Sequence, residues 1–296
     1  MKTKPPSHGF RNSNDRVRQE YRRSRIAALS GDIDRRTQAA AGIASRAAVT
    51  IPRDEGYVVC PPGRFEDTPD MVSLARGVMT SVDLEEKRAK ANKPFMVSLD
   101  AMDEISLDSP MLRFALRPDI VASAAQYLGV VPILQYANVM YSSHVAAEPS
   151  KSQLYHCDSD EAEQVKVFVL CEEVTAASGP LTFVPAAQSQ VVRDKTGYKY
   201  KSRLTDEAVH TAFGPGLTET ALTGAPETIA FIDTSRCLHY GSRILDNSAR
   251  RLVVMLQYIT PTAFILPEDD FRAGAKFRHL ARPEHDEITS MVLGAL

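Results

Sequence analysis

The sequence lacks any long hydrophobic run. Unbroken apolar stretches do not exceed about five residues, as in Leu252 to Leu256, whereas a membrane-spanning helix needs about 20. We therefore expect no membrane association. The first ten residues also lack the apolar stretch of a secretory signal, so we expect a cytoplasmic protein. With 44% hydrophobic and 24% charged residues, the composition is that of a folded globular protein.

Several familiar sequence signatures are also missing. The four cysteines (Cys60, Cys157, Cys171 and Cys237) lie far apart and form no Cys-x-x-Cys pair. This spacing argues against a structural zinc site or a disulfide framework, and it fits a reducing compartment. The sequence contains no Gly-x-Gly-x-x-Gly, Walker A or Gly-x-Ser-x-Gly motif. Nucleotide binding by those routes and serine-hydrolase chemistry therefore lack support.

Charge is unevenly distributed along the chain. Residues 1–50 carry 11 lysines and arginines against four acidic residues, whereas the other 246 residues carry 24 against 33. A basic arm on an acidic body could contact an acidic partner. The simpler interpretation is a solvated helix or a frayed terminus, and we expect no nucleic-acid partner. We treat residues 1–45 as a basic N-terminal arm that is partly disordered or helical.

The order of the predicted elements indicates the fold class. Helical composition marks residues 14–45, 68–80 and 109–128, and short β-rich runs separated by turns follow from residue 130 onward. These runs are Ile133–Tyr141, Leu154–Tyr155, Val165–Cys171, Leu181–Val184, Thr228–Ile232 and Leu252–Ile259. Helices first and strands later favour a mainly antiparallel β core with flanking helices, for which a double-sheet jelly roll is one solution.

We divide the chain around this core. The predicted core domain comprises residues 46–265, and residues 266–296 form a C-terminal tail. Residues 188–225 contain few apolar runs. Because a loop of this length inside a compact domain is more often functional than a linker, we expect it to be a lid.

A metal-ligand pattern occurs at the end of the second β-rich run. In Tyr155-His156-Cys157-Asp158, His156 and Asp158 project to the same side of a strand, because side chains alternate, while Cys157 points away. His239 is the natural third ligand. Two imidazoles and one carboxylate leave positions open on a metal, an arrangement that suits non-haem Fe(II). The alternative is a local hydrogen bond between a histidine and a nearby carboxylate.

Two further segments accompany these ligands. Arg250 lies eleven residues after His239, and a guanidinium there can pair bidentately with a carboxylate. Arg251 follows directly, and a shift of one residue in strand register would exchange the two; the spacing favours Arg250. The segment Gly179-Pro180-Leu181, with Pro185, lies between the ligand positions.

The order and spacing of these segments resemble the phytanoyl-CoA dioxygenase family of Fe(II)/2-oxoglutarate oxygenases. The resemblance covers roughly residues 50–262 and includes Gly56 to Val59 and the segment from Arg117 to Gly129. The chain departs from the family where a Pro-Gly-Ser-His segment is common, since it reads Pro185-Ala186-Ala187-Gln188. The resemblance implies a double-stranded β-helix of the jelly-roll or cupin-like type.

The resemblance also implies a reaction. His156, Asp158 and His239 would hold Fe(II) at the catalytic centre, and Arg250, helped by Ser242, would bind the far carboxylate of 2-oxoglutarate. The enzyme would use O₂ to oxidise a C–H bond of a small organic substrate and release succinate and CO₂. Hydroxylation and desaturation stay open, as do the oligomeric state and the choice among acyl-CoA, amino-acid-like and secondary-metabolite substrates.

Other residues are candidates for contacts with the co-substrate or substrate. They are Tyr141, Gln153, Tyr155, Lys166, Arg193, Tyr198 and Tyr200. His144 is a further histidine worth testing, because it follows a core strand. Two other functions stay open: a non-catalytic jelly-roll protein that binds a metal or a carboxylate ligand, and a metalloenzyme that uses the triad without 2-oxoglutarate.

Overall fold

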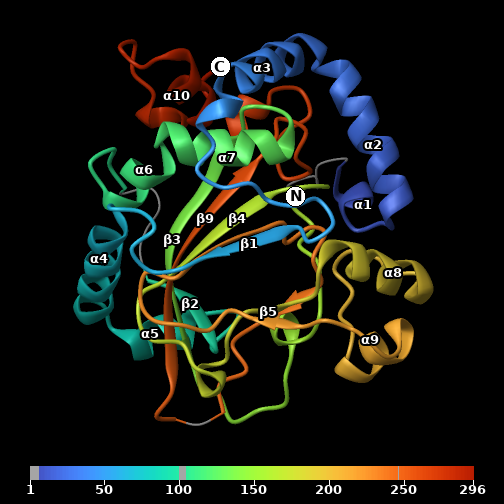
Figure 1. Ribbon diagram of the computed structural model, residues 1–296, viewed down its shortest axis with the longest axis vertical. Helices are drawn as coiled ribbons and strands as arrows, with labels where there is room; N and C mark the ends of the chain where they lie inside the picture. The colour runs from blue at the N-terminus through green and yellow to red at the C-terminus, as the bar shows by residue number, and fades with distance from the viewer. Residues whose placement is uncertain (1–6, 100–104, 246) are drawn as a thin grey trace.

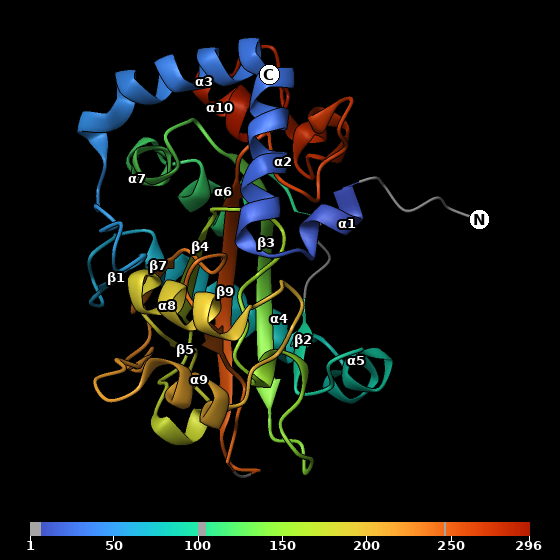
Figure 2. The ribbon, with the colours of Figure 1, turned by 90° about the vertical axis from the view of Figure 1, so that its right-hand side faces the viewer.

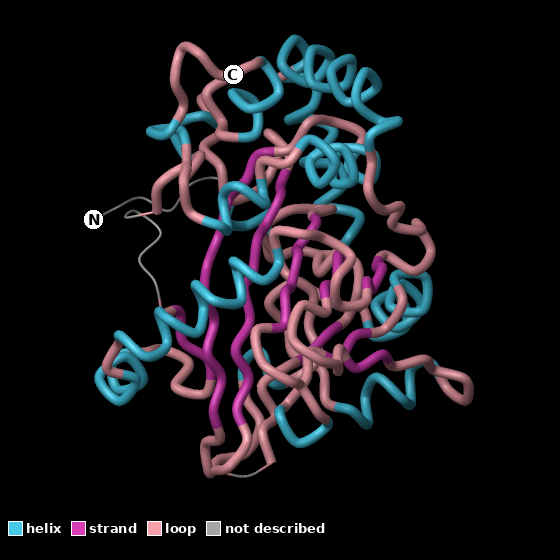
Figure 3. The backbone as a smooth tube through the Cα atoms, turned by 60° about the vertical axis from the view of Figure 1, so that its left-hand side comes forward, coloured by secondary structure: helices cyan, strands magenta, loops and turns pink. Residues whose placement is uncertain are grey.

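A six-stranded antiparallel sheet forms the centre of the molecule (Figure 1). The computed structural model describes residues 7–99, 105–245 and 247–296. The strand order is β1-β7-β4-β9-β3-β2. The strands are β1 Tyr57–Cys60, β2 Met96–Ser98, β3 Ile133–Ser143, β4 Val165–Leu170, β7 Ile229–Ile232 and β9 Arg250–Ile259. These strands, magenta in Figure 3, run alongside one another beneath helices, which confirms the predicted mainly β core with flanking helices.

A smaller three-stranded sheet has the order β6-β5-β8. Its strands are β5 Thr182–Phe183, β6 Thr220–Ala221 and β8 His239–Tyr240. An isolated antiparallel bridge between His156 and His239 extends this sheet toward the segment that precedes β4. The candidate metal ligands therefore come from adjacent stretches of backbone.

Helices cover the outer face of the large sheet and flank the small one. They are α1 Ser7–Arg11, α2 Asp15–Ala28, α3 Ser30–Ile43, α4 Thr68–Ser81, α5 Leu84–Lys90, α6 Pro110–Ala115, α7 Pro118–Leu128, α8 Ala186–Thr196, α9 Asp206–Phe213 and α10 Glu287–Val292. α4, α6 and α7 contact strands of the large sheet, and α8 packs on α9 beside the small sheet (Figure 2). Within the described ranges, no helix is long and apolar enough to cross a bilayer.

Side-chain alternation along β4 and β9 separates the core from the inner face of the sheet. Val165, Val167 and Val169 of β4 are buried in the main hydrophobic core, on the helix-covered face. Lys166, Phe168 and Leu170 project to the opposite face, where they line a pocket. β9 alternates in the same way, with Leu252, Val254 and Leu256 in the core and Arg251, Val253 and Met255 lining the pocket.

The N-terminal arm is folded against the body rather than solvated. Arg36 of α3 is 1% exposed and donates hydrogen bonds to the carbonyls of Val131 (2.7 Å) and Met291 (2.9 Å). Figures 1 and 2 show α3 beside α10, the C-terminal helix that contains Met291. The interpretation of the basic arm as a solvated helix is therefore wrong for Arg36.

Arg18 and Arg25 of α2 are buried in the same way. Arg18 donates to the carbonyl of Glu161 at 2.6 Å. Arg25 donates to those of Pro261 and Leu266 at 3.1 and 3.2 Å. We expected disorder over residues 1–13. Residues 1–6 lie outside the described residues, and the expectation is wrong for Ser7–Arg11, which form α1.

The predicted lid, residues 188–225, contains most of α8, all of α9 and β6. Val192 and Val209 of these helices are fully buried in a hydrophobic cluster that also contains Tyr155 and Cys157. Of the residues in this stretch, Leu222 lines the pocket described below. The segment is thus a packed helical layer behind the small sheet, and a lid movement stays a prediction.

Candidate active site

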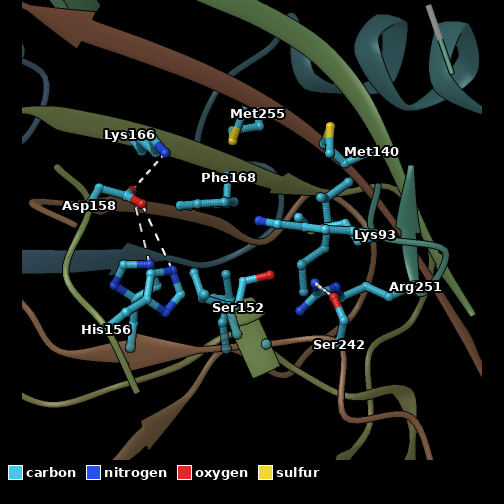
Figure 4. A pocket seen from close by; sticks show the side chains of 17 residues that line it. Lys93, Met140, Ser152, His156, Asp158, Lys166, Phe168, Ser242, Arg251 and Met255 are labelled. Atoms are coloured by element: carbon cyan, nitrogen blue, oxygen red, sulfur yellow. Dashed lines mark hydrogen bonds and ion pairs between the residues drawn. The ribbon is translucent and has the colours of Figure 1, made fainter. Parts of the chain in front are cut away.

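His156, Asp158 and His239 converge in a pocket between the two sheets (Figure 4). Each offers one ligand atom, and these atoms lie within 4.8 Å of one another. The Nε2 atoms of His156 and His239 are each 3.9 Å from a different oxygen of Asp158. Both histidines are 6% exposed. The three side chains are therefore close enough to hold one metal ion.

Main-chain hydrogen bonds orient both imidazoles. Nδ1 of His156 lies 2.9 Å from the carbonyl oxygen of Leu154, and Nδ1 of His239 lies 2.9 Å from that of Cys237. When Nδ1 carries the proton and donates it to these carbonyls, the lone pair of Nε2 points toward Asp158. This is the arrangement in which metal-binding histidines are usually held.

The electrostatics of the cluster favour the metal-binding protonation states. Burial, reinforced by neighbouring His239, holds the pKa of His156 well below its usual range, and burial also lowers the pKa of His239. Burial alone would raise the pKa of Asp158, but the Lys166 ammonium holds it well below its usual range. Neutral imidazoles and an ionised carboxylate are therefore the expected forms.

Lys166 belongs to this cluster. Its ammonium lies 2.7 Å from Oδ2 of Asp158, and Gln164 Nε2 lies 3.3 Å from the same oxygen. The ion pair fixes one carboxylate oxygen and leaves Oδ1 toward His156. Lys166 was among the candidates selected from the sequence, and the structure places it in the pocket.

Arg251, rather than Arg250, enters the other end of the pocket. Arg251 is 6% exposed and donates hydrogen bonds to the carbonyl of Gly179 (2.7 Å) and to Oγ of Ser242 (2.9 Å). It forms no ion pair with any described acidic residue, and burial alone lowers its pKa to about 10. Its buried Nε makes no hydrogen bond. A buried guanidinium of this kind is a site for an anion.

The expectation that Arg250 faces the site is wrong. Its side chain is 51% exposed and pairs with Glu172, with Nε 2.9 Å from Oε2. Strand alternation explains the error, because the apolar side chains of Leu252, Val254 and Leu256 face the core and Arg250 shares their parity. The same alternation, read from the sequence, would have selected Arg251.

Ser242 and Gln153 support this end of the pocket in different ways. Ser242 lines the pocket, and its hydroxyl contacts both Arg251 and Ser142, the latter at 3.0 Å. Gln153 does not line it; its amide nitrogen donates to the carbonyl of Ser242 at 2.9 Å. Ser242 has φ of 62°, a left-handed conformation that is unfavourable for a serine. Gln153 therefore holds a strained residue in position.

Two glycines allow close packing of the backbone around Arg251. A Cβ atom on Gly241 would approach the Arg251 guanidinium to 3.2 Å. Gly179 has φ of 61°, and a Cβ atom there would lie 2.8 Å from the backbone nitrogen of Arg243. The Gly-Pro-Leu segment noted in the sequence thus supplies the carbonyl that accepts a hydrogen bond from Arg251.

The wall between the two ends is mostly apolar and contains one additional lysine. Met140, Phe168 and Met255 line it, and Lys93 extends its ammonium among them (Figure 4). Lys93 lies between α5 and β2, far in sequence from the metal ligands and from Arg251. Sequence reasoning missed it, since no local pattern distinguishes it from neighbouring surface lysines.

Most other sequence candidates lie outside this pocket. Tyr155, Arg193, Tyr198 and Tyr200 pack behind the ligand segment; for example, Arg193 pairs with Asp15 at 2.9 Å and lies 3.6 Å from the Cys157 thiol. Cys157 is excluded from the ligand cluster. Tyr141 packs against the main core. Nδ1 of His144 lies 2.8 Å from the carbonyl oxygen of Ile244, away from the pocket.

Comparison with known proteins gives structural likeness only. The sequence matches no protein-family model and no curated protein. The chain is similar to the crystal structure of EctD from S. alaskensis with bound Fe. The two sequences are 18% identical, the alignment covers 73% of this chain and 76% of the EctD chain, and the TM-score is 0.52. The chain is also similar to SnoN, a non-heme alpha ketoglutarate dependent epimerase from nogalamycin biosynthesis (16% identity, 76% and 84% coverage, TM-score 0.44).

A third similar structure is HygX from Streptomyces hygroscopicus with nickel, 2-oxoglutarate and hygromycin B bound. Its sequence is 12% identical, the alignment covers 73% of this chain and 86% of the HygX chain, and the TM-score is 0.46. At these identities the likeness to EctD shows the fold, a double-stranded β-helix with flanking helices, as predicted. Membership of the phytanoyl-CoA dioxygenase family stays a prediction.

Proposed function

We propose that this protein is an Fe(II)- and 2-oxoglutarate-dependent oxygenase that oxidises a C–H bond of a small organic substrate. The observation that carries the proposal is the placement of two complementary sites in one pocket. His156, Asp158 and His239 form a metal-ligand set at one end, and the buried guanidinium of Arg251 lies at the other. A dicarboxylate that chelates a metal through one end presents its second carboxylate to such a cation.

The side chains fit both groups. The two Nε2 atoms and one oxygen of Asp158 would hold iron, and a set of two histidines and one carboxylate is a ligand set of non-haem iron oxygenases. Arg251 and the Ser242 hydroxyl would bind the far carboxylate, in place of the Arg250 expected from spacing. The unpaired Nε of Arg251 is one donor available to that carboxylate. When bound, the iron and keto acid supply the oxidative decarboxylation that releases succinate and CO₂.

The remaining pocket residues orient the Asp158 carboxylate and exclude water from the pocket. Lys166 holds the Asp158 carboxylate through Oδ2, so that its other oxygen has a fixed direction. Leu170, Leu181 and Val253 line the pocket that also contains Arg251. Their apolar side chains would exclude water from it. Exclusion of water strengthens the attraction between Arg251 and a carboxylate.

Two other functions compete with this proposal. A non-catalytic jelly-roll protein could bind a metal or a carboxylate without turnover, and a metalloenzyme could use the triad alone. The burial of Arg251 without an acidic partner in the described residues disfavours the metalloenzyme that uses the triad alone, because a buried unpaired charge is costly unless a ligand compensates it. Against the non-catalytic protein stands the presence of the complete ligand set and Arg251 in one pocket, which binding of a metal or of a carboxylate alone would not require.

An anaerobic absorbance titration with Fe(II) and then 2-oxoglutarate tests the proposal. Chelation of Fe(II) by the keto acid produces a weak visible charge-transfer band. We expect the band in the wild-type protein and its loss in His239→Ala. Arg251→Ala should need at least about tenfold more 2-oxoglutarate, since a charge-assisted contact is lost. Arg250→Ala is the matched control and should behave as wild type.

The other outcomes identify the alternatives. Iron binding without a band in the folded wild-type protein would contradict a role for 2-oxoglutarate and leave a different metalloenzyme. Absence of iron binding would favour the non-catalytic protein. A larger effect of Arg250→Ala than of Arg251→Ala would contradict the assignment of Arg251.

A further inference from the structure

The pocket contains more cations than the proposed reaction uses. Its charged side chains are Lys93, Lys166, Arg251 and one carboxylate, Asp158. Lys166 is paired with Asp158, and Arg251 is assigned to the co-substrate. Within residues 7–99, 105–245 and 247–296, the Lys93 ammonium forms no hydrogen bond or ion pair. Lys93 is therefore a cation with no role in the proposed site.

Lys93 is directed into the pocket rather than into solvent. Figure 4 shows its ammonium extending between the Asp158 end and the Arg251 end, next to Phe168. Burial lowers the pKa of Lys93, and the nearby charge of Asp158 acts in the opposite direction. A half-buried ammonium without a protein partner is unfavourable, and an anionic ligand group would remove that cost.

The surroundings of Lys93 are apolar and adaptable. Met96, Met140, Met255 and Phe168 line the pocket beside it. Methionine side chains are unbranched and flexible, so they pack well against aliphatic groups of varied shape. This part of the wall thus combines one cation with a surface suited to a hydrocarbon chain.

The outer side of the ligand cluster is also basic. A second groove shares His156 and Asp158 with the main pocket and is lined by Arg11, Lys201 and Arg203. Arg11 is paired with Asp160, whereas Arg203 donates to the main-chain carbonyls of Lys151 and Ser202 at 2.9 and 2.8 Å. Positive charge around a site attracts anions and accelerates their binding.

We propose that the primary substrate is an aliphatic molecule with a carboxylate or phosphate group that binds Lys93, while its hydrocarbon part packs on Met140, Met255 and Phe168. The proposal rests on the proposed function, because that function assigns Arg251 to 2-oxoglutarate. It predicts a second anion site, separate from Arg251, in the same pocket.

Ligand-observed NMR titrations test whether the pocket prefers an anionic headgroup to a neutral or a cationic one. The probes are hexanoate, hexyl phosphate, hexanol and hexylamine, added to wild-type protein that is saturated with Zn(II) and 2-oxoglutarate. We expect hexanoate or hexyl phosphate to bind at least about tenfold more tightly than hexanol and hexylamine. The comparison of the two anions tells which headgroup Lys93 takes. Equal binding of anion and alcohol would overturn the proposal.

Substitutions assign the preference to a residue. Lys93→Met should remove the advantage of the anion over hexanol, and Lys93→Arg should keep it. Lys90→Met is the matched control, because Lys90 is exposed and pairs with Glu86 on the same helix. If Lys93→Met weakens 2-oxoglutarate binding but leaves hexanoate binding unchanged, Lys93 belongs to the co-substrate site and the proposal fails.

A second arm separates this proposal from the proposed function. In Arg251→Met without metal or 2-oxoglutarate, Lys93 is the remaining partner-free cation among the described residues of the pocket. A preference for hexanoate over hexanol there, lost on adding Lys93→Met, supports the anion site even if the wild-type protein fails to bind 2-oxoglutarate. No preference in this background contradicts it.

Discussion

His156 and His239 exchange two main-chain hydrogen bonds. The backbone N–H of each donates to the carbonyl of the other, at 3.0 and 2.9 Å. The two imidazole centroids are 4.2 Å apart as a result. Two segments that are distant in sequence thus fix the relative position of the ligands through the backbone, and this contact does not depend on a metal.

Metal removal should therefore leave the fold intact. We expect the far-ultraviolet circular dichroism spectrum to be unchanged by a chelator. The amides of His156 and His239 should stay protected from hydrogen exchange in the metal-free protein. The melting temperature should rise with added Fe(II) only as mass action requires. Unfolding, or fast exchange at both amides without metal, would show that the site forms only around the ion.

Gln153→Ala should weaken 2-oxoglutarate binding without changing metal binding. The substitution removes the hydrogen bond to the Ser242 carbonyl and frees a residue with unfavourable φ. The loss of one buried hydrogen bond corresponds to about a fivefold change in affinity. The absorbance titration with Fe(II) and 2-oxoglutarate measures both constants. Gln126→Ala, which removes an exposed amide of α7, is the control; equal effects would contradict a positioning role.

Gly179→Ala should strongly destabilise the protein, whereas Gly77→Ala should not. A Cβ atom on Gly179 would meet the Arg243 nitrogen at 2.8 Å and would also require positive φ, so we expect a loss of about 2 kcal/mol or more. Gly77 is exposed in α4 with open space around it, and alanine there should stabilise by roughly 0.5–1 kcal/mol. Urea unfolding of both variants makes the comparison. Similar values for the two would contradict close packing at Gly179.

Asp233 should make stability fall with rising pH. Burial and nearby Glu163 raise the pKa of Asp233 to about 7. An acid whose pKa is raised on folding binds a proton more tightly in the folded state, so its contribution is lost as the pH rises from its ordinary pKa through about 7. The stability of wild type relative to Asp233→Asn should decline between about pH 4 and about pH 7, by at most about 1.4 kcal/mol per pH unit.

Urea unfolding across this range measures the decline. Asp70→Asn is the control, because Asp70 is an exposed carboxylate paired with Arg113. A difference between wild type and Asp233→Asn that stays constant with pH would show that Asp233 titrates alike in the folded and unfolded chain.

Arg36→Met should lower the free energy of unfolding far more than Arg35→Met, the substitution of its neighbour. Arg36 is buried, and its removal leaves the carbonyls of Val131 and Met291 without this donor, so we expect a loss of about 3–5 kcal/mol. Arg35 forms an exposed ion pair with Glu287, which is worth about 0–1 kcal/mol. Chemical denaturation measures both losses. Equal small losses would mean that the buried contacts of Arg36 do not contribute to folding.

Local patterns predicted the elements of the core well. Five of the six β-rich runs correspond to β3, β4, β5, β7 and β9, and the helix from Pro118 ends at Gly129. The sixth run, Leu154–Tyr155, is not a strand, and Tyr155 forms only an isolated bridge with Leu204. In these segments the hydrophobic pattern and the turn residues agree with the tertiary structure. The 188–225 segment was less predictable, because α8 has a weakly amphipathic sequence and is stabilised by packing against the Tyr155 cluster.

The site could be predicted where its residues are close in sequence or lie on a strand. Strand alternation led to the His156–Asp158 pair, although His156 forms only an isolated bridge and Asp158 lies outside any strand. The alternation of β9 would have led to Arg251. Lys93 could not be found this way, because only the tertiary structure brings its loop to the pocket. Composition likewise could not separate buried Arg36 from exposed Arg35, since both are arginines of one helix.

The acceptors of Arg18, Arg25 and Arg36 are main-chain carbonyls. A carbonyl stays in place when its side chain is exchanged, provided that the backbone keeps its course. Positions such as Leu266 and Met291 can therefore vary in hydrogen-bonding chemistry without loss of the contact, whereas the three arginines cannot. The contacts of the arm therefore depend on the course of the backbone and not on the side chains of the covered segments. Related proteins could keep the same arm while the sequences of those segments diverge.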